Sequence, residues 1–352
     1  MPDTISARTA LDLLPTNTYG MLDVRSEGEF ATAAIPGFYN APILRDQERH
    51  EVGLCYRLQG QAAAIELGER LVGPVRESRV DEWLRNTAPG SPMIVCCWRG
   101  GMRSALASEW IEERGHEVLR VEGGYKALRH DLLDVLAGPP AFRVLSGLTG
   151  AGKTRLLEAL PISDKLDIEA CAAHRGSSFG RLLHRPQPTQ TNFENSLALG
   201  LRITQQPVLV EDESKVVGSL HIPEAVIDAM TNSPVIMLEA TLEERCSNIY
   251  EEYIEQELNS GLEKQKLEEV ALASTFRLRR RLGGLLTSKV VEQIHQAFAS
   301  SDREAHMRWI ATLLTEYYDG RYAHSQLHST RSVTFRGTFE ECRQWILEQY
   351  AR

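Results

Sequence analysis

The stretch Val95-Cys96-Cys97-Trp98-Arg99-Gly100-Gly101-Met102-Arg103-Ser104 decides how the first part of this chain folds. The apolar run at residues 92–95 predicts a buried strand that carries Cys97 to its carboxyl end. Ser104 can then cap a helix whose apolar residues recur at helical spacing, namely Leu106, Trp110 and Ile111. The stretch therefore predicts a strand, a glycine-rich loop and a helix in succession.

A thiol in such a loop faces backbone N–H groups and a helix N-terminus, which bind anions and favour the thiolate form of a cysteine. Gly100 and Gly101 let the loop curl around a ligand. Arg103 supplies a guanidinium group for the same anion. We predict that Cys97 is a reactive thiolate, whereas Cys96, on the opposite face of the strand, is an ordinary buried cysteine.

Length and composition limit the possible classes of protein. A chain of 352 residues most naturally forms two domains, and its net charge of −9 argues against a uniformly basic nucleic-acid binder while leaving a local basic patch possible. The six cysteines show neither zinc-site spacing nor a disulfide framework. With no apolar run long enough to cross a bilayer and no signal-peptide pattern, we expect a cytoplasmic protein, with a monomer favoured.

Residues 1–138 carry a set of motifs in a fixed order. Asp23-Val24-Arg25 ends a predicted strand, Ile35-Pro36-Gly37-Phe38-Tyr39-Asn40-Ala41-Pro42 follows, and Glu122-Gly123-Gly124 comes after the cysteine loop. Together they resemble the rhodanese-like superfamily, which implies an α/β domain. Five residues separate Cys97 from Arg103, where sulfurtransferases usually have four, so the loop is similar to that of the phosphatase-type members. A loop of this length suits a tetrahedral anion such as phosphate, thiophosphate or selenophosphate.

Two features depart from the rhodanese pattern. The histidine that usually precedes Ile-Pro-Gly is Ala34, and residues 44–90 form an unusually long insertion. The insertion is either a lid over the cysteine loop or a surface excursion, and the sequence leaves both open.

Gly138-Pro139-Pro140 is the clearest linker in the chain, because proline cannot continue a helix. A predicted strand at residues 142–146 follows it and runs into Gly147-Leu148-Thr149-Gly150-Ala151-Gly152-Lys153-Thr154, with a predicted helix behind. This is the phosphate-binding loop (P-loop) pattern G-x-x-x-x-G-K-T in its strand–loop–helix setting. Gly147, Gly150 and Gly152 allow the backbone N–H groups to hold phosphate oxygens, Lys153 neutralises them, and Thr154 is placed for Mg²⁺. Residues 139–352 are therefore predicted to be a P-loop α/β domain with a helical C-terminal part.

Acidic residues follow a second apolar strand of this domain. Residues 207–210 run into Glu211-Asp212-Glu213, and Glu211 and Asp212 are the candidate metal-holding acids, with Asp212 and Thr154 as expected Mg²⁺ ligands. The alternative is a solvated acidic turn. A short strand is predicted to place Asp167 and Glu169 on one face. His174 and Arg175 then begin a candidate active-site loop, unless they are ordinary exposed residues.

Positive charge is concentrated in a predicted helix near residue 280. Arg277, Arg280 and Arg281 share one helix face, which suits an RNA backbone or a phosphate clamp, although such a run is often only a solvated surface.

In this chain a rhodanese-like cysteine loop is followed by a P-loop. In this order of motifs the chain resembles one family, the bacterial tRNA 2-selenouridine synthases. Matching stretches run through almost the whole chain, including residues 53–60, 96–104, 121–129, 147–154, 174–180, 209–214 and 316–319. The resemblance implies an enzyme that replaces sulfur by selenium in wobble 2-thiouridine of tRNA, using selenophosphate. It also implies geranyl diphosphate as a substrate, an S-geranyl-2-thiouridine intermediate, and no tightly bound cofactor.

The same resemblance implies roles for individual residues. Cys97 would carry selenium as a perselenide, while Arg103 and Arg99 would hold selenophosphate. The resemblance does not say which ligand the P-loop holds; our hypothesis is that it holds the diphosphate of geranyl diphosphate rather than a nucleotide. Two other classes stay open at this stage: a nucleotide-regulated sulfurtransferase or persulfide carrier, and a phosphatase, which only the loop length suggests.

Overall fold

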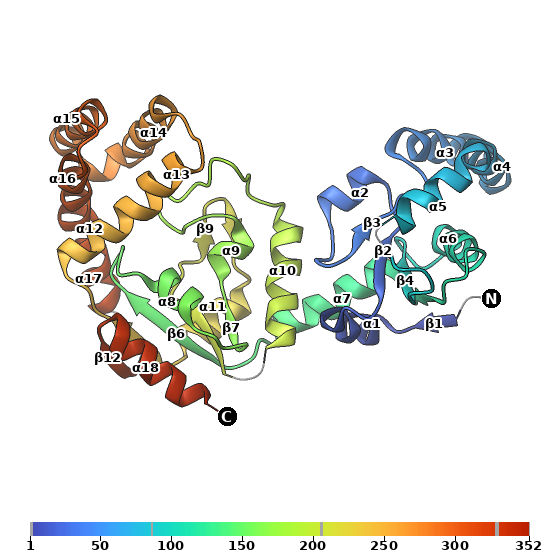
Figure 1. Cartoon of the computed structure of the whole chain (residues 1–352), viewed down its shortest axis with the longest axis horizontal. Helices are drawn as coiled ribbons and strands as arrows, with labels where there is room; N and C mark the ends of the chain where they lie inside the picture. Colours follow the sequence, from blue (N-terminus) through green and yellow to red (C-terminus); the bar gives the residue numbers. More distant parts are fainter. Residues whose placement is uncertain (1–2, 86, 205–206, 328–330, 352) are drawn as a thin grey trace. The chain divides into compact units, whose positions relative to one another are not determined.

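The structure, a computed structural model, describes residues 3–85, 87–204, 207–327 and 331–351. It comprises two compact units, of which the first contains Met1–Gly138 with Thr189–Ile203 and the second contains Pro139–Pro188 with Thr204–Arg352. Each unit is built on a five-stranded sheet (Figure 1). The α/β fold class predicted for both parts, with helices gathered near the C-terminus, is confirmed.

The sheet of the first unit is parallel throughout, in the order β1-β5-β4-β2-β3. Every residue of the central strand β4 is buried, because helices cover both faces of such a sheet and its inner strands therefore read as continuous apolar runs. The strand predicted before Cys97 is thus confirmed. The strands are β1 (Asp3–Ile5), β2 (Gly20–Asp23), β3 (Tyr39–Asn40), β4 (Met93–Cys96) and β5 (Val118–Val121).

Helices connect these strands, and the insertion at residues 44–90 supplies the helices between β3 and β4. Residues 44–90 fold mainly into three helices, and Val72, Val80 and Trp83 pack into the same apolar core as Val95 of β4. The insertion is therefore anchored in the core and is not a loose surface excursion. The helices are α1 (Ala7–Leu13), η1 (Leu14–Thr16), α2 (Glu27–Thr32), α3 (Asp46–Gln59), α4 (Gln61–Val72), η2 (Gly73–Val75), α5 (Arg76–Leu84), α6 (Met102–Glu112), α7 (Gly124–Ala137) and α10 (Gln190–Ile203).

Helix α10 belongs to the first unit, although the sequence analysis assigned its residues to the second domain. It packs along α7, and its Asn195 side chain donates to the carbonyl of Ala34 at 2.7 Å. Asn192 accepts from the N–H of Ala34 at 2.6 Å. Both backbone groups of Ala34, the residue that replaces the usual histidine, are thus satisfied by a helix about 160 residues further along the chain.

The second unit has a parallel sheet in the order β12-β11-β6-β8-β7. Leu156 and Leu157 of α8 and Ile346 of α18 pack with sheet residues such as Leu145 in its core. Its strands are β6 (Phe142–Gly147), β7 (Lys165–Leu166), β8 (Val208–Glu211), β11 (Val235–Leu238) and β12 (Val333–Gly337), with a small antiparallel pair, β9 (Val216–Val217) and β10 (Leu220–His221). The helices next to this sheet in sequence are α8 (Lys153–Ala159), α9 (Ile168–Ala172), α11 (Glu224–Thr231) and α18 (Phe339–Tyr350).

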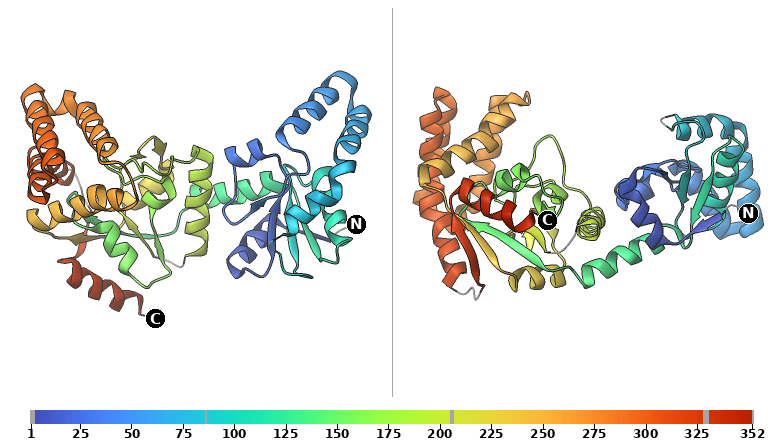
Figure 2. Two further views of the ribbon diagram at one scale, coloured as in Figure 1. Left: turned by 45° about the horizontal axis from the view of Figure 1, so that its top comes forward. Right: turned by 60° about the horizontal axis from the view of Figure 1, so that its bottom comes forward.

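A helical part completes the second unit, and its long helices α14, α15 and α16 pack in succession around their own apolar core (Figure 2). Two π-helical turns interrupt it, η3 (Glu251–Glu255) and η4 (Leu314–Tyr318). Such turns are rare and are found mostly at functional sites. The other elements are α12 (Leu242–Tyr250), α13 (Gln256–Asn259), α14 (Lys264–Leu282), α15 (Gly284–Ser300), α16 (Arg303–Leu313) and α17 (Asp319–Leu327).

A buried ion pair fixes the end of β2 in the first unit. Arg25 donates from Nη2 to Asp23 Oδ2 at 2.6 Å, and neither side chain is exposed. The same Nη2 donates to the carbonyl of Ala33, and the guanidinium group lies 3.8 Å from the centre of the Tyr125 ring. Arg25 therefore joins β2, the end of α2 and the start of α7.

We expect Arg25→Leu to lower the free energy of unfolding by about 3–5 kcal/mol, because it leaves the Asp23 carboxylate buried without its partner. Urea unfolding followed by tryptophan fluorescence measures the change. Arg8→Leu is the control, since the exposed pair of Arg8 with Asp131 contributes at most about 1 kcal/mol. Equal small effects of the two substitutions would contradict this assignment.

Candidate functional site

The cysteine loop lies between β4 and α6. Cys97 directly follows β4 and is only 3% exposed, with its thiol donating to Ser104 Oγ at 3.2 Å. Helix α6 begins at Met102, so Ser104 lies in its first turn and is not the cap that the sequence analysis expected. Since the Ser104 hydroxyl can rotate to donate to sulfur, it is positioned to stabilise a Cys97 thiolate. Cys96 is fully buried, and burial raises the pKa of its thiol well above the usual value.

The backbone of this loop is arranged to receive an anion. The carbonyls of Cys97 and Trp98 accept hydrogen bonds from the start of α7, at 2.7 and 3.1 Å. By contrast, the N–H groups of residues 98–103, all within the described part of the chain, donate to no protein acceptor. Gly100 has a positive φ and passes so close to Val121 that a Cβ atom would clash with its carbonyl oxygen. The loop therefore offers unpaired donors beside the sulfur of Cys97.

The two arginines predicted for this loop are placed differently. Arg99 is exposed. Arg103 donates to Glu29 at 2.7 Å, and Arg49 of α3 lies 2.8 Å from the same carboxylate. Burial alone would raise the pKa of Glu29, but the hydrogen bonds and charges of Arg103 and Arg49 lower it to about 2. Glu29, which the sequence analysis missed, thus links the cysteine loop to the insertion.

The P-loop joins β6 to α8 in the second unit. Gly150 and Gly152 have φ values of 81° and 90°, which other residues rarely adopt. Lys153 Nζ donates to the carbonyl of Gly147 at 3.2 Å, and Thr154 donates to Glu169 at 3.3 Å. Residues of this loop line a polar cavity of about 350 Å³. The loop therefore has the geometry that the sequence predicted.

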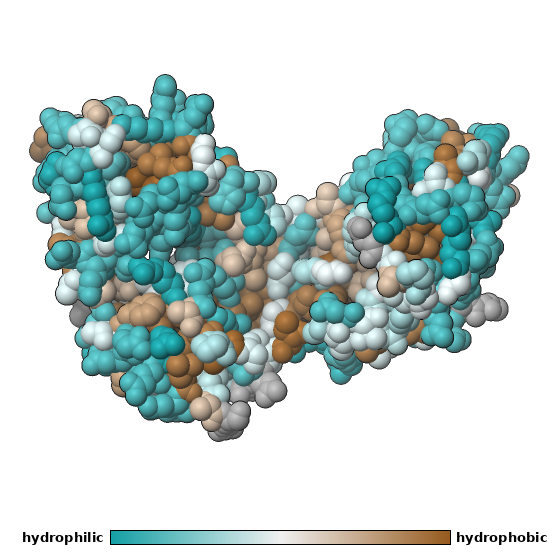
Figure 3. Space-filling model, in the orientation of Figure 1, coloured by the Kyte–Doolittle hydropathy of each residue, from teal (hydrophilic) through white to brown (hydrophobic). Residues whose placement is uncertain are grey.

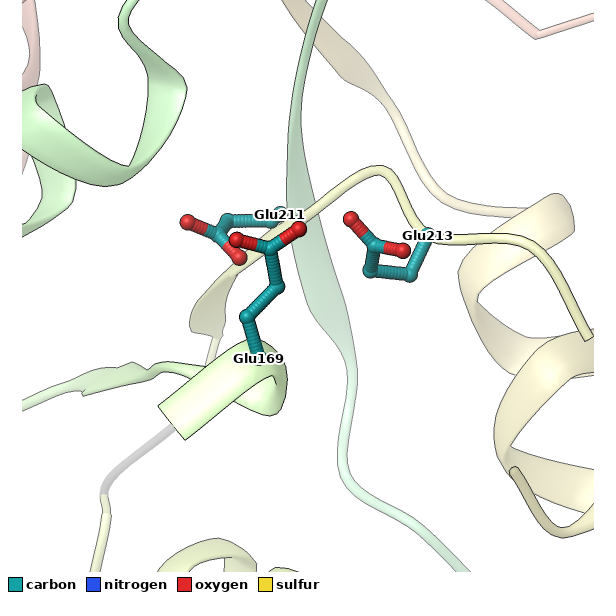
Figure 4. Close-up of side chains that lie close together, drawn as sticks. All are labelled: Glu169, Glu211 and Glu213. Atoms are coloured by element: carbon teal, nitrogen blue, oxygen red, sulfur yellow. The ribbon is translucent and has the colours of Figure 1, made fainter. Parts of the chain in front are cut away.

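Three carboxylates meet beside Thr154. Ligand atoms of Glu169, Glu211 and Glu213 lie within 4.8 Å of one another, and their carboxylates point toward each other (Figure 4). Glu211 is fully buried, and neither of its oxygens has a hydrogen-bond partner among the described residues. Buried carboxylates without partners are costly, and a hard cation such as Mg²⁺ satisfies them with oxygen ligands. The residues present therefore fit a divalent cation.

Burial, together with the charges of Asp167 and Glu213, raises the pKa of Glu211 to about 8. Burial likewise raises the pKa of Glu169 to about 10, aided by the charges of Glu211 and Glu213. The pKa of Glu213 is also raised by burial. Without a cation, Glu211 and Glu169 keep protons at neutral pH.

Two expectations about this acidic region are corrected. Asp212 forms an ion pair with Arg331 through both oxygens, at 2.8 Å each, and accepts from Ser146 at 2.5 Å, so it is already paired and is a poorer metal ligand than Glu211. Asp167 caps helix α9, and Glu169 lies in its first turn, so they are not on one strand. Glu213 was missed as a ligand, although the period of two along an extended chain places it on the same side as Glu211.

The loop that starts at His174 closes on the three carboxylates. Gly176 has a positive φ, and a Cβ atom there would lie 2.3 Å from Glu169 and about 3 Å from Glu213. Arg175 lines the cavity and donates to Glu257 at 2.9 Å. His174 is nearly buried outside that cavity, and burial together with Arg277 and Arg175 lowers its pKa. Gly176 is therefore the residue of this loop that lies against Glu169 and Glu213.

The helical part supports the P-loop. Arg245 donates to the carbonyl of Thr149 at 2.8 Å and pairs with Asp319, while Asn248 donates to the carbonyl of Gly150 at 2.9 Å. Tyr253 of η3 and Tyr318 of η4 line the cavity, together with Tyr322. The sequence analysis missed these residues, because only tertiary packing brings them to the P-loop.

The basic residues of α14 are exposed, as a surface contact requires. Arg277 donates to the carbonyl of Ser178, in the loop that follows His174, and Arg281 donates to Tyr317 of η4 at 3.2 Å. Arg280 is exposed on the same helix. None of the helices in the described ranges is long and apolar enough to span a membrane.

Comparisons with known proteins match both units. The family model "tRNA 2-selenouridine synthase AAA domain" matches residues 140–352, and the model "Rhodanese-like domain" matches residues 6–131. A tRNA 2-selenouridine synthase from Shewanella woodyi is 38% identical, covering 98% of both chains, and one from Marinobacter nauticus is 39% identical, covering 94% of both.

Two solved structures are similar to parts of the chain. The N-terminal domain of a putative ATP/GTP binding protein from Clostridium difficile is 32% identical and covers 37% of this chain and 99% of its own, with a TM-score of 0.33. A rhodanese-related protein from Thermoplasma volcanium is 20% identical and covers 37% of this chain and 92% of its own, with a TM-score of 0.23.

A cysteine loop after a central strand, followed along the chain by a P-loop unit, defines a rhodanese-like domain joined to a P-loop domain. The chain belongs to the tRNA 2-selenouridine synthase family, a family of enzymes, as the order of its motifs predicted.

We expect Mg²⁺ binding to the second unit to release protons at pH 7 and to tighten as the pH rises from 6 to 8. The reason is that the cation needs ionised carboxylates, whereas the raised pKa values of Glu211 and Glu169 keep them protonated without it. Titration calorimetry in buffers of different ionisation enthalpy measures both effects. Glu211→Gln should weaken binding at least tenfold, and Glu239→Gln, on an exposed residue, is the control. Binding without proton release would contradict the site.

Proposed function

We propose that this chain converts wobble 2-thiouridine of tRNA into 2-selenouridine in two steps, using geranyl diphosphate and then selenophosphate. The observation that carries the proposal is the presence of two separate anion-binding loops, each with its own reactive group. One holds the Cys97 thiol beside unpaired N–H groups, and the other holds Lys153 beside three carboxylates. The reaction takes place in the cytoplasm, where its tRNA substrate is found.

The first step alkylates sulfur at the P-loop. The thiocarbonyl sulfur attacks C1 of geranyl diphosphate, the allylic C–O bond breaks, and diphosphate leaves with the electron pair while the uracil N3 proton is lost. Lys153 and the P-loop N–H groups hold the diphosphate, and Glu169, Glu211 and Glu213 with Thr154 hold Mg²⁺. The cation supplies charge that neutralises the leaving group.

The walls of the P-loop cavity favour an allylic diphosphate over a nucleotide. Tyr253, Tyr318 and Tyr322 line it, and aromatic faces stabilise positive charge that develops on an allylic carbon. No nucleotide hydrolysis is needed for alkylation. The competing function, a nucleotide-gated sulfurtransferase, predicts ATP hydrolysis that is independent of tRNA.

The second step takes place at the cysteine loop, where selenophosphate is expected to bind. It can proceed because the S-geranyl group is a better leaving group than a thiocarbonyl sulfur. Arg103 and the N–H groups of residues 98–103 hold selenophosphate, with Arg103 exchanging Glu29 for the anion. Cys97 takes up selenium as a perselenide.

Selenium in a perselenide is two electrons more oxidised than selenium in selenophosphate or in the product, so a disulfide of an external thiol is the oxidant. Selenium of selenophosphate attacks the mixed disulfide of Cys97 with that thiol, the thiol leaves, and water breaks the P–Se bond to release phosphate. After selenium has bonded to C2, the thiol cleaves the remaining S–Se bond and regenerates the mixed disulfide.

We expect Lys153→Ala to abolish geranylation of 2-thiouridine in tRNA while selenation of pre-geranylated tRNA continues, since only the first step uses the diphosphate. Mass spectrometry of digested nucleosides measures both products. Lys215→Ala, on an exposed lysine of the same unit, should leave both steps unchanged. Equal loss of the two steps in Lys153→Ala would contradict the division of labour.

We expect Cys97→Ser to stop the reaction at geranylated tRNA, because a serine hydroxyl at neutral pH is a far weaker nucleophile than a thiolate. The same nucleoside assay should show S-geranyl-2-thiouridine accumulating at least 100-fold over 2-selenouridine. Cys55→Ser, in the same unit, is the matched control.

Isotopes test what Cys97 carries. With labelled selenophosphate, a disulfide as oxidant and no tRNA, selenium label should stay on the wild-type protein and be lost in Cys97→Ser, and phosphorus label should be absent from both. Phosphorus label on Cys97 would instead identify it as a nucleophile toward phosphorus and overturn the perselenide.

A further inference from the structure

An apolar pocket lies in the first unit, between the α3–α4 hairpin and α6. Its volume is about 630 Å³, within the range of small-molecule sites, and most of its lining is carbon. In the space-filling view, hydrophobic residues reach the surface among polar ones in the region of α3 to α6 (Figure 3). The apolar side chains that form it include Val52, Tyr56, Ile65, Met102, Leu106 and Trp110.

One end of this pocket is charged and adjoins the cysteine loop. Arg103 and Met102 belong to the first turn of α6, directly after that loop, and both line the pocket. Arg49 of α3 lines it as well, and Glu29 binds both arginines. The pocket therefore fits a ligand with a polar reacting end and an apolar body, and its polar end coincides with the predicted selenophosphate site.

The pocket of the first unit is much larger than the apolar pocket near the P-loop. Phe179, Trp309 and Leu313 line a second apolar pocket next to the P-loop cavity, but its volume is about 30 Å³. That is the share of liquid volume that one water molecule takes, about 30 Å³, and is too small for a ten-carbon chain. The pocket of the first unit can enclose such a chain.

We propose that the pocket between α3–α4 and α6 binds the geranyl chain of S-geranyl-2-thiouridine while selenium replaces the geranylthio group at the cysteine loop. This inference rests on the proposed function. In the step itself, the perselenide selenium on Cys97 bonds to C2 and the C2–S bond breaks, with its electrons leaving on sulfur. A thiol then cleaves the S–Se bond and frees the selenated base. The geranylthiolate takes a proton from solvent and departs as geranylthiol, so the chain held in the pocket belongs to the leaving group.

Charge and chemistry point to this occupant. A tRNA-linked chain brings phosphates and a polar base to the arginine end while its hydrocarbon fills the apolar end. A purely anionic ligand would leave the apolar lining uncovered, and a purely apolar ligand would make no ion pair with Arg49 or Arg103. The insertion at residues 44–90 is then the segment that recognises the alkyl group.

The test compares single-turnover selenation of tRNA carrying S-geranyl- or S-methyl-2-thiouridine by the full-length enzyme. The wild type should prefer the geranyl substrate by about 100-fold or more, because burial of each additional methylene favours it. Gly53→Trp fills the pocket from α3, where an added Cβ atom would have no neighbour within 4 Å. It should slow the geranyl substrate at least tenfold and leave the methyl substrate unchanged.

Leu58→Trp, on an exposed residue of the same helix outside the pocket, is the matched control. Gly73→Trp fills the pocket from another side and covers the case in which Gly53→Trp does not fold. An unchanged geranyl preference in the folded, pocket-filled variants would overturn the inference. Loss of geranylation with normal selenation would also overturn it, by assigning the pocket to the first step. If the wild type itself makes no S-geranyl product and selenates unalkylated 2-thiouridine directly, the proposed function fails instead.

Discussion

Unpaired backbone N–H groups at the end of a parallel strand are the constraint on which both reactive loops depend. In a parallel sheet the backbone donors of the strand are used in pairing, but the loop that turns into the next helix leaves its own donors free. After β4 these are the N–H groups of residues 98–103, and after β6 they are those of the P-loop other than Ala151, whose N–H donates to the carbonyl of Leu148 at 3.0 Å. An anion can satisfy them, and the N-termini of α6 and α8 add to the attraction. Cys97 therefore begins one such loop directly after β4, and Lys153, the first residue of α8, lies at the end of the other.

The cations of the two loops are held in different ways. Arg103 is held by the Glu29 carboxylate, whereas Lys153 donates to the carbonyl of Gly147. Binding of an anion at the cysteine loop is then an exchange, in which Arg103 leaves Glu29 and Arg49 remains to compensate that carboxylate. An exchange between two good ion pairs gains less free energy than a new pair in isolation, but it positions the arginine before the ligand arrives.

Features that depend on neighbouring residues could be predicted from the sequence, and features that depend on distant ones could not. The strand before Cys97 and the P-loop were recognised because apolar runs and glycine spacing are local signals. The pairing of Asp212 with Arg331 joins residues 119 positions apart, so Asp212 looked like a free metal ligand. Helix α10 was misassigned for the same reason, since its partners on α7 and at Ala34 lie far away in sequence. Asp167 was misjudged for a different reason, because an N-cap and a strand residue are both followed by apolar positions.

If the proposed function holds, the insertion gives a physical reason for a ten-carbon alkyl group where a methyl group would already make sulfur a leaving group. Exchange at C2 requires the nucleoside to be held against the selenium donor in one orientation, and the reacting atoms offer little surface for that. Apolar surface removed from water on a remote chain supplies binding free energy, which the enzyme can use to orient the reacting centre and to exclude water from it. A pocket anchored in the same core as β4, through Val72, Val80 and Trp83, transmits that orientation rigidly to the cysteine loop. In the proposed reaction, a long alkyl group would both activate sulfur as a leaving group and be the part of the substrate that the first unit recognises.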